Sequence, residues 1–245
     1  MTTKKKIKII GINSSPRKTS RAAQQESSTR ILLDHSLKSL GSKADTEIID
    51  LVDLEFYPTE GCYSTDENLN HSPCKHYNDD FEKVLFKKFK DADGVIFSSP
   101  TYWLSMSSRL SALFERLTEM DPIVSSPKER LLQGKVAGAI ATAHVEGSAE
   151  VCYEILKKAN YLGFVIPPHA FAFHTAGQME FSYNNKKSLK KDKLAFDNAA
   201  MVAKNVLKMC ELVKSSKNKW VVFKERTHKP SKNELAHKYS KSEHK

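Results

Sequence analysis

The sequence predicts an α/β protein in which helices cover both faces of a parallel β-sheet. Short runs of apolar, often β-branched residues alternate along the chain with amphipathic segments of helical spacing. The apolar runs are nearly continuous, as expected of strands that are buried on both faces. With 245 residues, 40% of them hydrophobic, the chain is long enough to form one such core.

Five segments have the length and composition of buried strands. The first ends abruptly at a group of hydroxyl residues, a proline and two basic residues. The third meets Pro100, which lacks a backbone N–H and is expected to prevent this strand from continuing as a central one. The five segments are 6–13, 46–52, 93–99, 135–142 and 164–166, the last with a continuation near 170–173.

Helices are predicted between and after these strands. The first begins within a run of hydroxyl residues, and Gly41 is placed to end it. The predicted helices are 27–40, 79–90, 106–119, 148–162 and 190–214. Residues 53–78 show no periodicity, and a loop of this length in a compact domain is usually functional or mobile.

We expect one domain over residues 1–214 and a basic, flexible tail over 215–245. The net charge is +10, but segment 214–245 holds ten Lys or Arg and three Glu and so carries +7 of it. No nucleic-acid-binding module accompanies this charge, so a solvated tail is favoured over nucleic-acid binding. An alternative is that segment 220–223 packs on the domain or on a neighbouring subunit. The chain lacks a long apolar run and a signal-peptide pattern, which predicts a soluble, cytoplasmic protein with no membrane partner.

Polar residues follow the first strand, at the edge of the sheet where ligands bind in such folds. Hydroxyl side chains, an arginine and the N-terminus of the first helix together offer donors to an anion. The pattern favours a phosphate site over an ordinary helix cap. The residues concerned are Ser14, Ser15, Arg17, Ser27, Ser28 and Thr29.

The ends of two further strands carry side chains that suit a planar ligand. Pro100, Thr101, Tyr102 and Trp103 follow the third strand and would form an aromatic wall, although packing of this loop onto the domain is an equal alternative. After the fourth strand, Thr142 and His144 could donate hydrogen bonds, and Gly147 would allow close backbone approach. Together the three loops suit a ligand the size of a mononucleotide.

Segments 11–17, 99–105, 115–116 and 135–147 resemble the NADPH-dependent FMN reductase family of flavodoxin-like flavoproteins. The resemblance covers about residues 5–173 and implies a five-stranded sheet of order 2-1-3-4-5. It also implies FMN, bound without a covalent bond, with its phosphate at Ser15, Arg17 and Thr29. Residues 100–103 would contact the ribityl chain and ring, and Thr142, His144 and Gly147 would line the ring's other edge.

Two features depart from the family pattern. Residues 19–26 look like an insertion, so either Ser20 or the pair Ser27 and Ser28 completes the phosphate site. The loop 53–78 is similar to that of the iron-sulfur flavoprotein branch, which has four cluster cysteines there, whereas here it holds two, so we predict no [4Fe–4S] cluster. Zinc is also disfavoured, because the spacing of the candidate ligands is not a standard one. Those candidates are Cys62, His71, Cys74 and His76.

The resemblance implies an NAD(P)H-dependent FMN reductase, an enzyme that passes electrons through bound FMN to a flavin, a quinone or a similar small planar acceptor. No residue is required as a general acid or nucleophile, but His144 could donate to the N1/O2 edge of the flavin. The alternative is a flavodoxin-like electron carrier without NAD(P)H activity, although such carriers are usually acidic. A homodimer or higher homo-oligomer is expected from the family. The motifs of P-loop kinases and of dinucleotide-binding Rossmann domains are absent.

Overall fold

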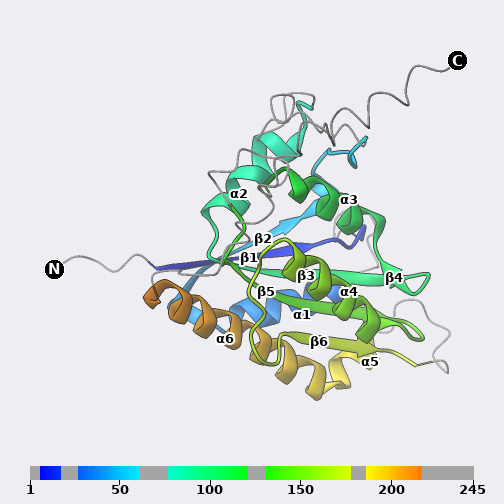
Figure 1. The fold of residues 1–245 in the computed structure, drawn as a ribbon. Helices are drawn as coiled ribbons and strands as arrows, with labels where there is room; N and C mark the ends of the chain where they lie inside the picture. The colour runs from blue at the N-terminus through cyan, green and yellow to red at the C-terminus, as the bar shows by residue number, and fades with distance from the viewer. Residues whose placement is uncertain (1–5, 18–26, 61–76, 121–130, 178–185, 217–245) are drawn as a thin grey trace, which may run out of the picture.

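A computed structural model describes residues 6–17, 27–60, 77–120, 131–177 and 186–216. In these residues five parallel strands form a sheet of order β2-β1-β3-β5-β6, and the short strand β4 pairs antiparallel with β3 (Figure 1). The strands are β1 Ile7–Asn13, β2 Ala44–Asp50, β3 Gly94–Tyr102, β4 Ser105–Met106, β5 Val136–Ala143 and β6 Phe171–Thr175. Strand β4 lies outside the row of parallel strands, so β5 and β6 are the fourth and fifth strands of that row. The row therefore has the predicted order 2-1-3-4-5, and the predicted flavodoxin-like fold is confirmed.

Helices cover both faces of the sheet, as predicted. Helices α1 and α6 pack on one face and α2, α3 and α4 on the other (Figure 1). On the second face, the ring of Phe97 in β3 meets those of Phe89, Phe114 and Phe164, with centroids 5.0–6.1 Å apart. The helices are α1 Ser28–Lys38, α2 Phe86–Asp91, α3 Ser108–Leu117, α4 Ser148–Tyr161, α5 Lys186–Lys191 and α6 Lys193–Ser215. No helix in the described ranges is both long and apolar enough to cross a bilayer.

Strand β3 runs past Pro100 to Tyr102, three residues beyond its predicted end, but among the described residues this continuation pairs with β4 alone and is not central, as predicted. The N–H of Ser14 donates to the carbonyl of Ser98, which shows that Ser98 directs its backbone polar groups toward β1. Pro100 lies two residues on and faces the same side, where the pairing with β1 has already ended at Asn13. The missing N–H of Pro100 therefore costs the sheet no hydrogen bond.

The last strand and the last helix differ from their predicted bounds. Within 164–166, only Val165 forms an isolated bridge, to Val136, and the strand proper is β6. The predicted helix 190–214 is divided at Asp192, whose carboxylate caps α6 by accepting from the N–H of Ala195 at 2.9 Å. Both shifts matter for the site, because they place His174 at the carboxyl end of β6 and Asp192 beside it.

Other boundaries shift by a few residues. Strand β2 is followed by a 3₁₀ turn at Leu51–Asp53, α2 is preceded by a π-helical turn at Phe81–Leu85, and α3 continues as a 3₁₀ turn at Thr118–Met120. A further 3₁₀ turn at Gly41–Lys43 follows α1. Several predictions lie outside the described residues: the insertion at 19–26 with Ser20, the candidate ligands Cys62, His71, Cys74 and His76, and the tail from 217 onward with segment 220–223.

A buried arginine joins the described ends of the long loop to α3. The side chain of Arg116 is fully buried and contacts three carboxylates: Nη1 donates to Asp79 at 2.7 Å, Nε to Glu119 at 2.5 Å, and Nη2 to Glu82. Nη1 also donates to the carbonyl of Tyr57 at 3.1 Å. The cluster therefore holds both the start and the end of this loop against the helical layer.

The Arg116 cluster makes stability depend on pH. Burial and the neighbouring carboxylate of Asp79 raise the pKa of Glu82 to about 7, against the attraction of Arg116. Because folding raises the pKa of this carboxyl, the folded protein loses stability as the pH rises from 4.5, the pKa in the unfolded chain, to about 7, the pKa in the folded one. The difference in unfolding free energy between Glu82→Gln and the wild type should therefore shift by about 2 kcal/mol in favour of the variant when the pH is raised from 5 to 8.

Urea unfolding of both proteins at the two pH values measures this difference. Glu47→Gln is the control, because Glu47 pairs with Lys88 while being 41% exposed, and such surface pairs contribute little. If the Glu82→Gln difference does not change with pH, Glu82 does not titrate in this window.

Candidate functional site

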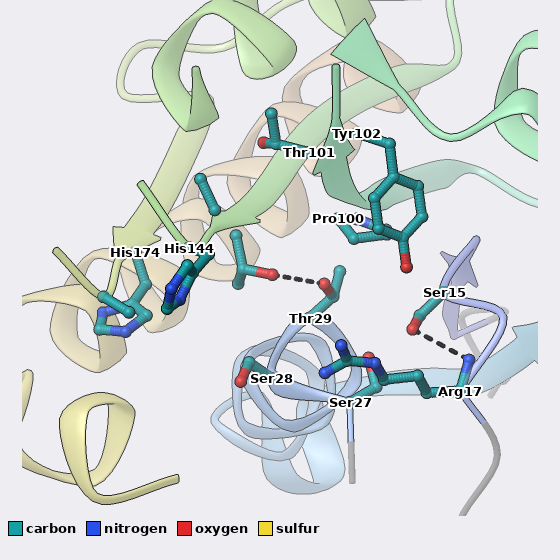
Figure 2. Close-up of a pocket in the computed structure, with 13 residues that line it drawn as sticks. Ser15, Arg17, Ser27, Ser28, Thr29, Pro100, Thr101, Tyr102, His144 and His174 are labelled. Carbon is teal, nitrogen blue, oxygen red and sulfur yellow. Dashed lines mark hydrogen bonds between the residues drawn. The ribbon is translucent and has the colours of Figure 1, made fainter. Parts of the chain in front are cut away.

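A hollow of about 210 Å³ lies at the carboxyl ends of β1, β3, β5 and β6 (Figure 2). This is the edge of a parallel sheet at which ligands are expected. Its lining combines hydroxyls, two imidazoles and a guanidinium with the rings of a proline and a tyrosine. The residues that line it are Ser15, Arg17, Ser27, Ser28, Thr29, Pro100, Thr101, Tyr102, Thr142, Ala143, His144, His174 and Ala176.

The start of α1 presents backbone donors to the hollow. Ser27 caps this helix, and its Oγ accepts from the N–H of Arg30 at 3.1 Å. The N–H groups at the first helical positions, Ser28 and Thr29, have no partner within the helix. In the preceding loop, the Oγ of Ser15 accepts from the N–H of Arg17 at 3.3 Å, which turns the chain so that both residues line the hollow (Figure 2). This end of the hollow suits an anion.

A polar network behind the loop holds it in place. The amide of Asn13 donates to Asp50 at 2.6 Å, and Nε of Arg30 donates to both oxygens of the same carboxylate at 3.0 Å. These residues lie at the ends of β1 and β2 and in the first turn of α1. The anion-binding end is thus braced before any ligand arrives, which lowers the entropy lost on binding.

Ser14 does not line the hollow. Its buried hydroxyl donates to the carbonyl of Ser98 at 2.9 Å, and the hydroxyl of Ser98 in turn donates to the carbonyl of Ile12 at 3.0 Å. These bonds fasten β1 to β3 beneath the site. The structure therefore places Ser14 in a structural role and its neighbour Ser15 in the lining.

The aromatic pair after β3 is divided by a tight hairpin. Tyr102 pairs with Ser105 across the turn, and the two turn residues, Trp103 and Leu104, have φ of 49° and 62°. Such turns favour Asn and Gly because both central residues need positive φ. Tyr102 lines the hollow, whereas Trp103 is 100% exposed and does not line it. Glu154 in α4 braces the hairpin by accepting from the hydroxyl of Ser105 at 3.0 Å.

Gly147 lies beside the hairpin and outside the lining. It precedes α4 with a φ of +86°, and a Cβ built on it would be 3.1 Å from Cγ2 of Thr101 and 3.2 Å from Cδ2 of Leu104. The close approach expected at Gly147 is therefore to the β3–β4 hairpin. The glycine allows the loop after β5 to pack against the strand end that carries Thr101.

Gly147→Ala should lower the unfolding free energy by about 2–3 kcal/mol. A left-handed backbone conformation costs an alanine roughly 1–2 kcal/mol, and the contacts with Thr101 and Leu104 add to this. Gly41→Ala is the matched control, because Gly41 also has a positive φ, +53°, but nothing lies within 4 Å of its added Cβ. Equal losses in urea unfolding of the two variants would show that the contacts with the hairpin contribute nothing.

The ends of β5 and β6 complete the hollow. Oγ1 of Thr142 lies 2.6 Å from Oγ1 of Thr29, so a hydroxyl pair joins β5 to the start of α1. His144 follows on the same edge, half-buried. His174 in β6 is 4% exposed, and its Nδ1 lies 2.6 Å from the carboxylate of Asp192. Sequence reasoning missed His174, because it placed the end of the strand at residue 173.

Thr101 and Tyr102 at the end of β3 both line the hollow, but their hydroxyls differ in exposure. Thr101 Oγ1 is buried and has no hydrogen-bond partner among the described residues. In Figure 2 the hydroxyl of Tyr102 points toward the side where Ser15 and Arg17 lie. Burial raises the pKa of Tyr102, while the charge of Arg17 acts in the opposite direction, so the phenol is a neutral donor near pH 7. The hydroxyl of Tyr102 is thus available to a polar ligand.

Comparison with known proteins adds three findings. The model of a family described as NADPH-dependent FMN reductase matches residues 7–178. An iron-sulfur flavoprotein of Methanocaldococcus jannaschii is 33% identical over 136 residues, 55% of this chain and 61% of that relative. An iron-sulfur flavoprotein of Archaeoglobus fulgidus is 26% identical over 206 residues, 83% of this chain and 97% of that relative.

Solved structures share the fold. A crystal structure of RosB with bound 8-demethyl-8-formylriboflavin-5′-phosphate aligns with a TM-score of 0.70 at 18% identity, over 86% of this chain and 81% of that chain. The likeness is one of architecture, and it agrees with the strand order described above.

Proposed function

This chain belongs to the NADPH-dependent FMN reductase family, and from that premise we propose that it binds FMN in the hollow and passes electrons from NAD(P)H to a small planar acceptor. The family match supports a flavin-dependent oxidoreductase. NAD(P)H as the donor and a flavin or a quinone as the acceptor are the further parts of the proposal. The alignment spans 61% of the Methanocaldococcus relative, so these parts rest on the site itself.

The observation that carries the proposal is the combination of groups that line the hollow. Arg17 and the start of α1 offer donors to an anion, and the ring of Tyr102 and the imidazole of His144 line the same hollow. FMN joins a phosphate to a polyhydroxyl chain and a flat ring, and so it needs both an anion site and an aromatic wall. The residues present therefore fit this cofactor.

Each part of the hollow has a task in this proposal. Arg17 and the N–H groups of Ser28 and Thr29 hold the phosphate, while Tyr102 lies against the rest of the cofactor. His144 donates to the pyrimidine edge of the ring, where reduction increases negative charge. Bound FMN supplies the acceptance of hydride from a nicotinamide and the delivery of electrons to a second substrate.

We also propose a homodimer or higher homo-oligomer. The hollow, at about 210 Å³, is smaller than the ~300–1,000 Å³ of typical ligand pockets, so the ring of FMN would extend beyond it. The exposed side chains of Trp103 and Leu104 lie beside that opening and would be covered by a second copy. A monomer in light scattering at micromolar concentration would contradict this proposal.

An iron-sulfur cluster, as in the names of the two relatives, is not part of the proposal. Four thiolates would be needed, and the chain has four cysteines in all. Two of them, Cys152 in α4 and Cys210 in α6, are buried in the cores on opposite faces of the sheet. They cannot bind one cluster together while the fold is intact.

The absorbance spectrum of the purified protein, with identification of the chromophore released on denaturation, tests the cofactor. Flavin bands and released FMN, with iron well below four atoms per chain, are the expected result. Anaerobic stopped-flow mixing with NADPH and with NADH then tests the donor. A protein that holds FMN but is reduced by neither nucleotide would be an electron carrier. A protein that is colourless and takes up no added FMN would overturn the proposed function.

A further inference from the structure

Positive charge is concentrated in one short segment of the domain. Residues 186–193, which form α5 and the start of α6, hold five lysines and one aspartate and so carry a net charge of +4. Residues 1–213 carry only +3 in all, since segment 214–245 holds +7 of the total of +10. The remainder of residues 1–213 therefore has a net charge of −1, and the segment stands out as a basic patch on a nearly neutral domain.

Two hydrogen bonds join this segment to residues that line the hollow. The carboxylate of Asp192 lies 2.6 Å from Nδ1 of His174, and the hydroxyl of Ser188 donates to the carbonyl of Ala176 at 3.5 Å. His174 and Ala176 both belong to the lining. Figure 2 shows His174 on the side of the hollow away from Arg17. The basic segment thus stands on the rim of the hollow, apart from the arginine to which we assign the phosphate of FMN.

The lysines of the segment face solvent without a described carboxylate partner. Lys190, Lys191 and Lys193 are exposed, and none of the ion pairs described for this chain involves them. Asp192 lies among them, but it accepts from Nδ1 of His174 and from the N–H of Ala195. Burial alone would raise the pKa of Asp192, but these hydrogen bonds lower it. Its charge is held by the strand end and the helix, which leaves the three ammonium groups to attract an anion from solution.

A nicotinamide dinucleotide has an anionic half that must lie outside the hollow. The hollow measures about 210 Å³ and would already be filled by FMN, so only the nicotinamide can reach the flavin ring. NADPH differs from NADH by a phosphate on the 2′-oxygen of its adenosine, and such a monoester carries a charge of about −1.5 to −2 at pH 7. Lysine binds phosphate as a mobile point charge, which suits a group held at a rim.

We propose that Lys190, Lys191 and Lys193 bind the 2′-phosphate of NADPH at the rim of the hollow and make the protein prefer NADPH over NADH. The inference rests on the proposed function and extends it, because it names the residues that select the electron donor. Arg17 and the lysines divide the work between them: Arg17 holds the phosphate of the cofactor, and the lysines hold that of the substrate.

Adenosine 2′,5′-bisphosphate is the probe for this site, because it carries the 2′-phosphate and has no nicotinamide. The full-length protein is first loaded with FMN, so that the anion site at Arg17 is filled, and is then titrated in a calorimeter at 50 mM salt. The bisphosphate should bind at least about tenfold more tightly than adenosine 5′-monophosphate. Replacement of all three lysines by alanine should remove this difference.

Anaerobic stopped-flow reduction gives the second readout. The triple alanine variant should lose about tenfold or more in kcat/KM for NADPH and less than about threefold for NADH, which lacks the 2′-phosphate. Salt at 300 mM should lower the preference of the wild type for NADPH, because it screens exposed charges. The matched control replaces Lys157, Lys204 and Lys208 by alanine. These lysines are equally exposed, but they lie more than two helical turns beyond the starts of α4 and α6, and we expect wild-type behaviour.

The outcomes separate this inference from the function on which it rests. If the protein takes up no FMN, or if neither nucleotide reduces it, the proposed function and the inference both fall. If NADPH reduces the FMN, but the bisphosphate binds the wild type and the triple variant alike, only the role of the lysines is overturned. Equal use of NADH and NADPH by the wild type would overturn it as well. Should the triple variant fail to fold by circular dichroism, Lys191→Glu takes its place, and unchanged binding of the bisphosphate in that variant overturns the role.

Discussion

Arg116→Ala should lower the free energy of unfolding at pH 7 by about 3–5 kcal/mol, the largest loss that we expect from a single substitution in this chain. The variant would leave Asp79, Glu82 and Glu119 close together and buried without their shared cation. It would also remove the guanidinium from the ring of Phe81, whose centroid lies 4.7 Å away. Total stabilities of domains are about 5–15 kcal/mol, so much of the margin would be lost.

The loss should shrink as the pH falls. Without Arg116, the crowded carboxylates repel one another and bind protons more readily, which neutralises them at mildly acidic pH. Urea unfolding at pH 5 and pH 8 should therefore show the smaller difference from the wild type at pH 5. A difference that grows toward pH 5 would contradict this account of the cluster.

Arg109→Ala is the matched control for Arg116→Ala. Arg109 lies two helical turns earlier in α3, donates to the carbonyl of Leu54 at 2.9 Å and stands 5.8 Å from the ring centroid of Phe56. Like Arg116→Ala, the variant Arg109→Ala loses a hydrogen bond to a backbone carbonyl and a contact with an aromatic ring. Unlike Arg116, Arg109 has no described contact with a carboxylate. We expect a loss of about 1 kcal/mol that does not change between pH 5 and pH 8.

Arg17→Ala should weaken binding of FMN by about 10- to 100-fold and leave binding of riboflavin nearly unchanged. A guanidinium at the phosphate end contributes charge-assisted hydrogen bonds that riboflavin cannot accept. Arg17→Lys keeps the charge but loses the paired donor geometry, so an intermediate loss is expected. Titration of the flavin-free wild type and of both variants with FMN and with riboflavin, followed by flavin fluorescence, measures these affinities.

Lys38→Ala controls for the general effect of removing a positive charge. Lys38 is at the far end of α1, 76% exposed, and pairs with Asp34 on the surface. Its removal should change the affinity for FMN less than twofold, because exposed charges at that distance are screened. Equal weakening of FMN and riboflavin by Arg17→Ala would show that Arg17 supports the loop and does not bind phosphate.

Local patterns in the sequence were sufficient to predict a parallel sheet, the alternation of strands and helices along the chain, and most residues that line the hollow. Continuous apolar strands require cover on both faces, and ligands of such sheets bind where the strands end. Ser15, Arg17 and Thr29 follow from this rule, as do Thr142 and His144, because each directly follows a recognisable strand or begins a helix. Nothing about their partners had to be known.

Only the tertiary structure decided which neighbouring residues serve the hollow and which serve the fold. Ser14 and Ser15 have the same hydroxyl, but the alternation of β1 turns Ser14 toward Ser98. Likewise, Tyr102 and Trp103 are adjacent aromatics, and the hairpin separates them. A shift of one residue decides which of two neighbours faces the hollow, and the composition of the segment does not reveal that shift.

The same holds for the two buried ionic groups. Arg116 finds Asp79 and Tyr57 at 37 and 59 residues' distance, and His174 finds Asp192 across the end of a strand and a short helix. Periodicity reports which face of an element is buried, whereas the pairing of charges depends on how separate elements pack. The sequence by itself therefore determined where a ligand could bind, and packing alone determined which residues there are held ready to bind it.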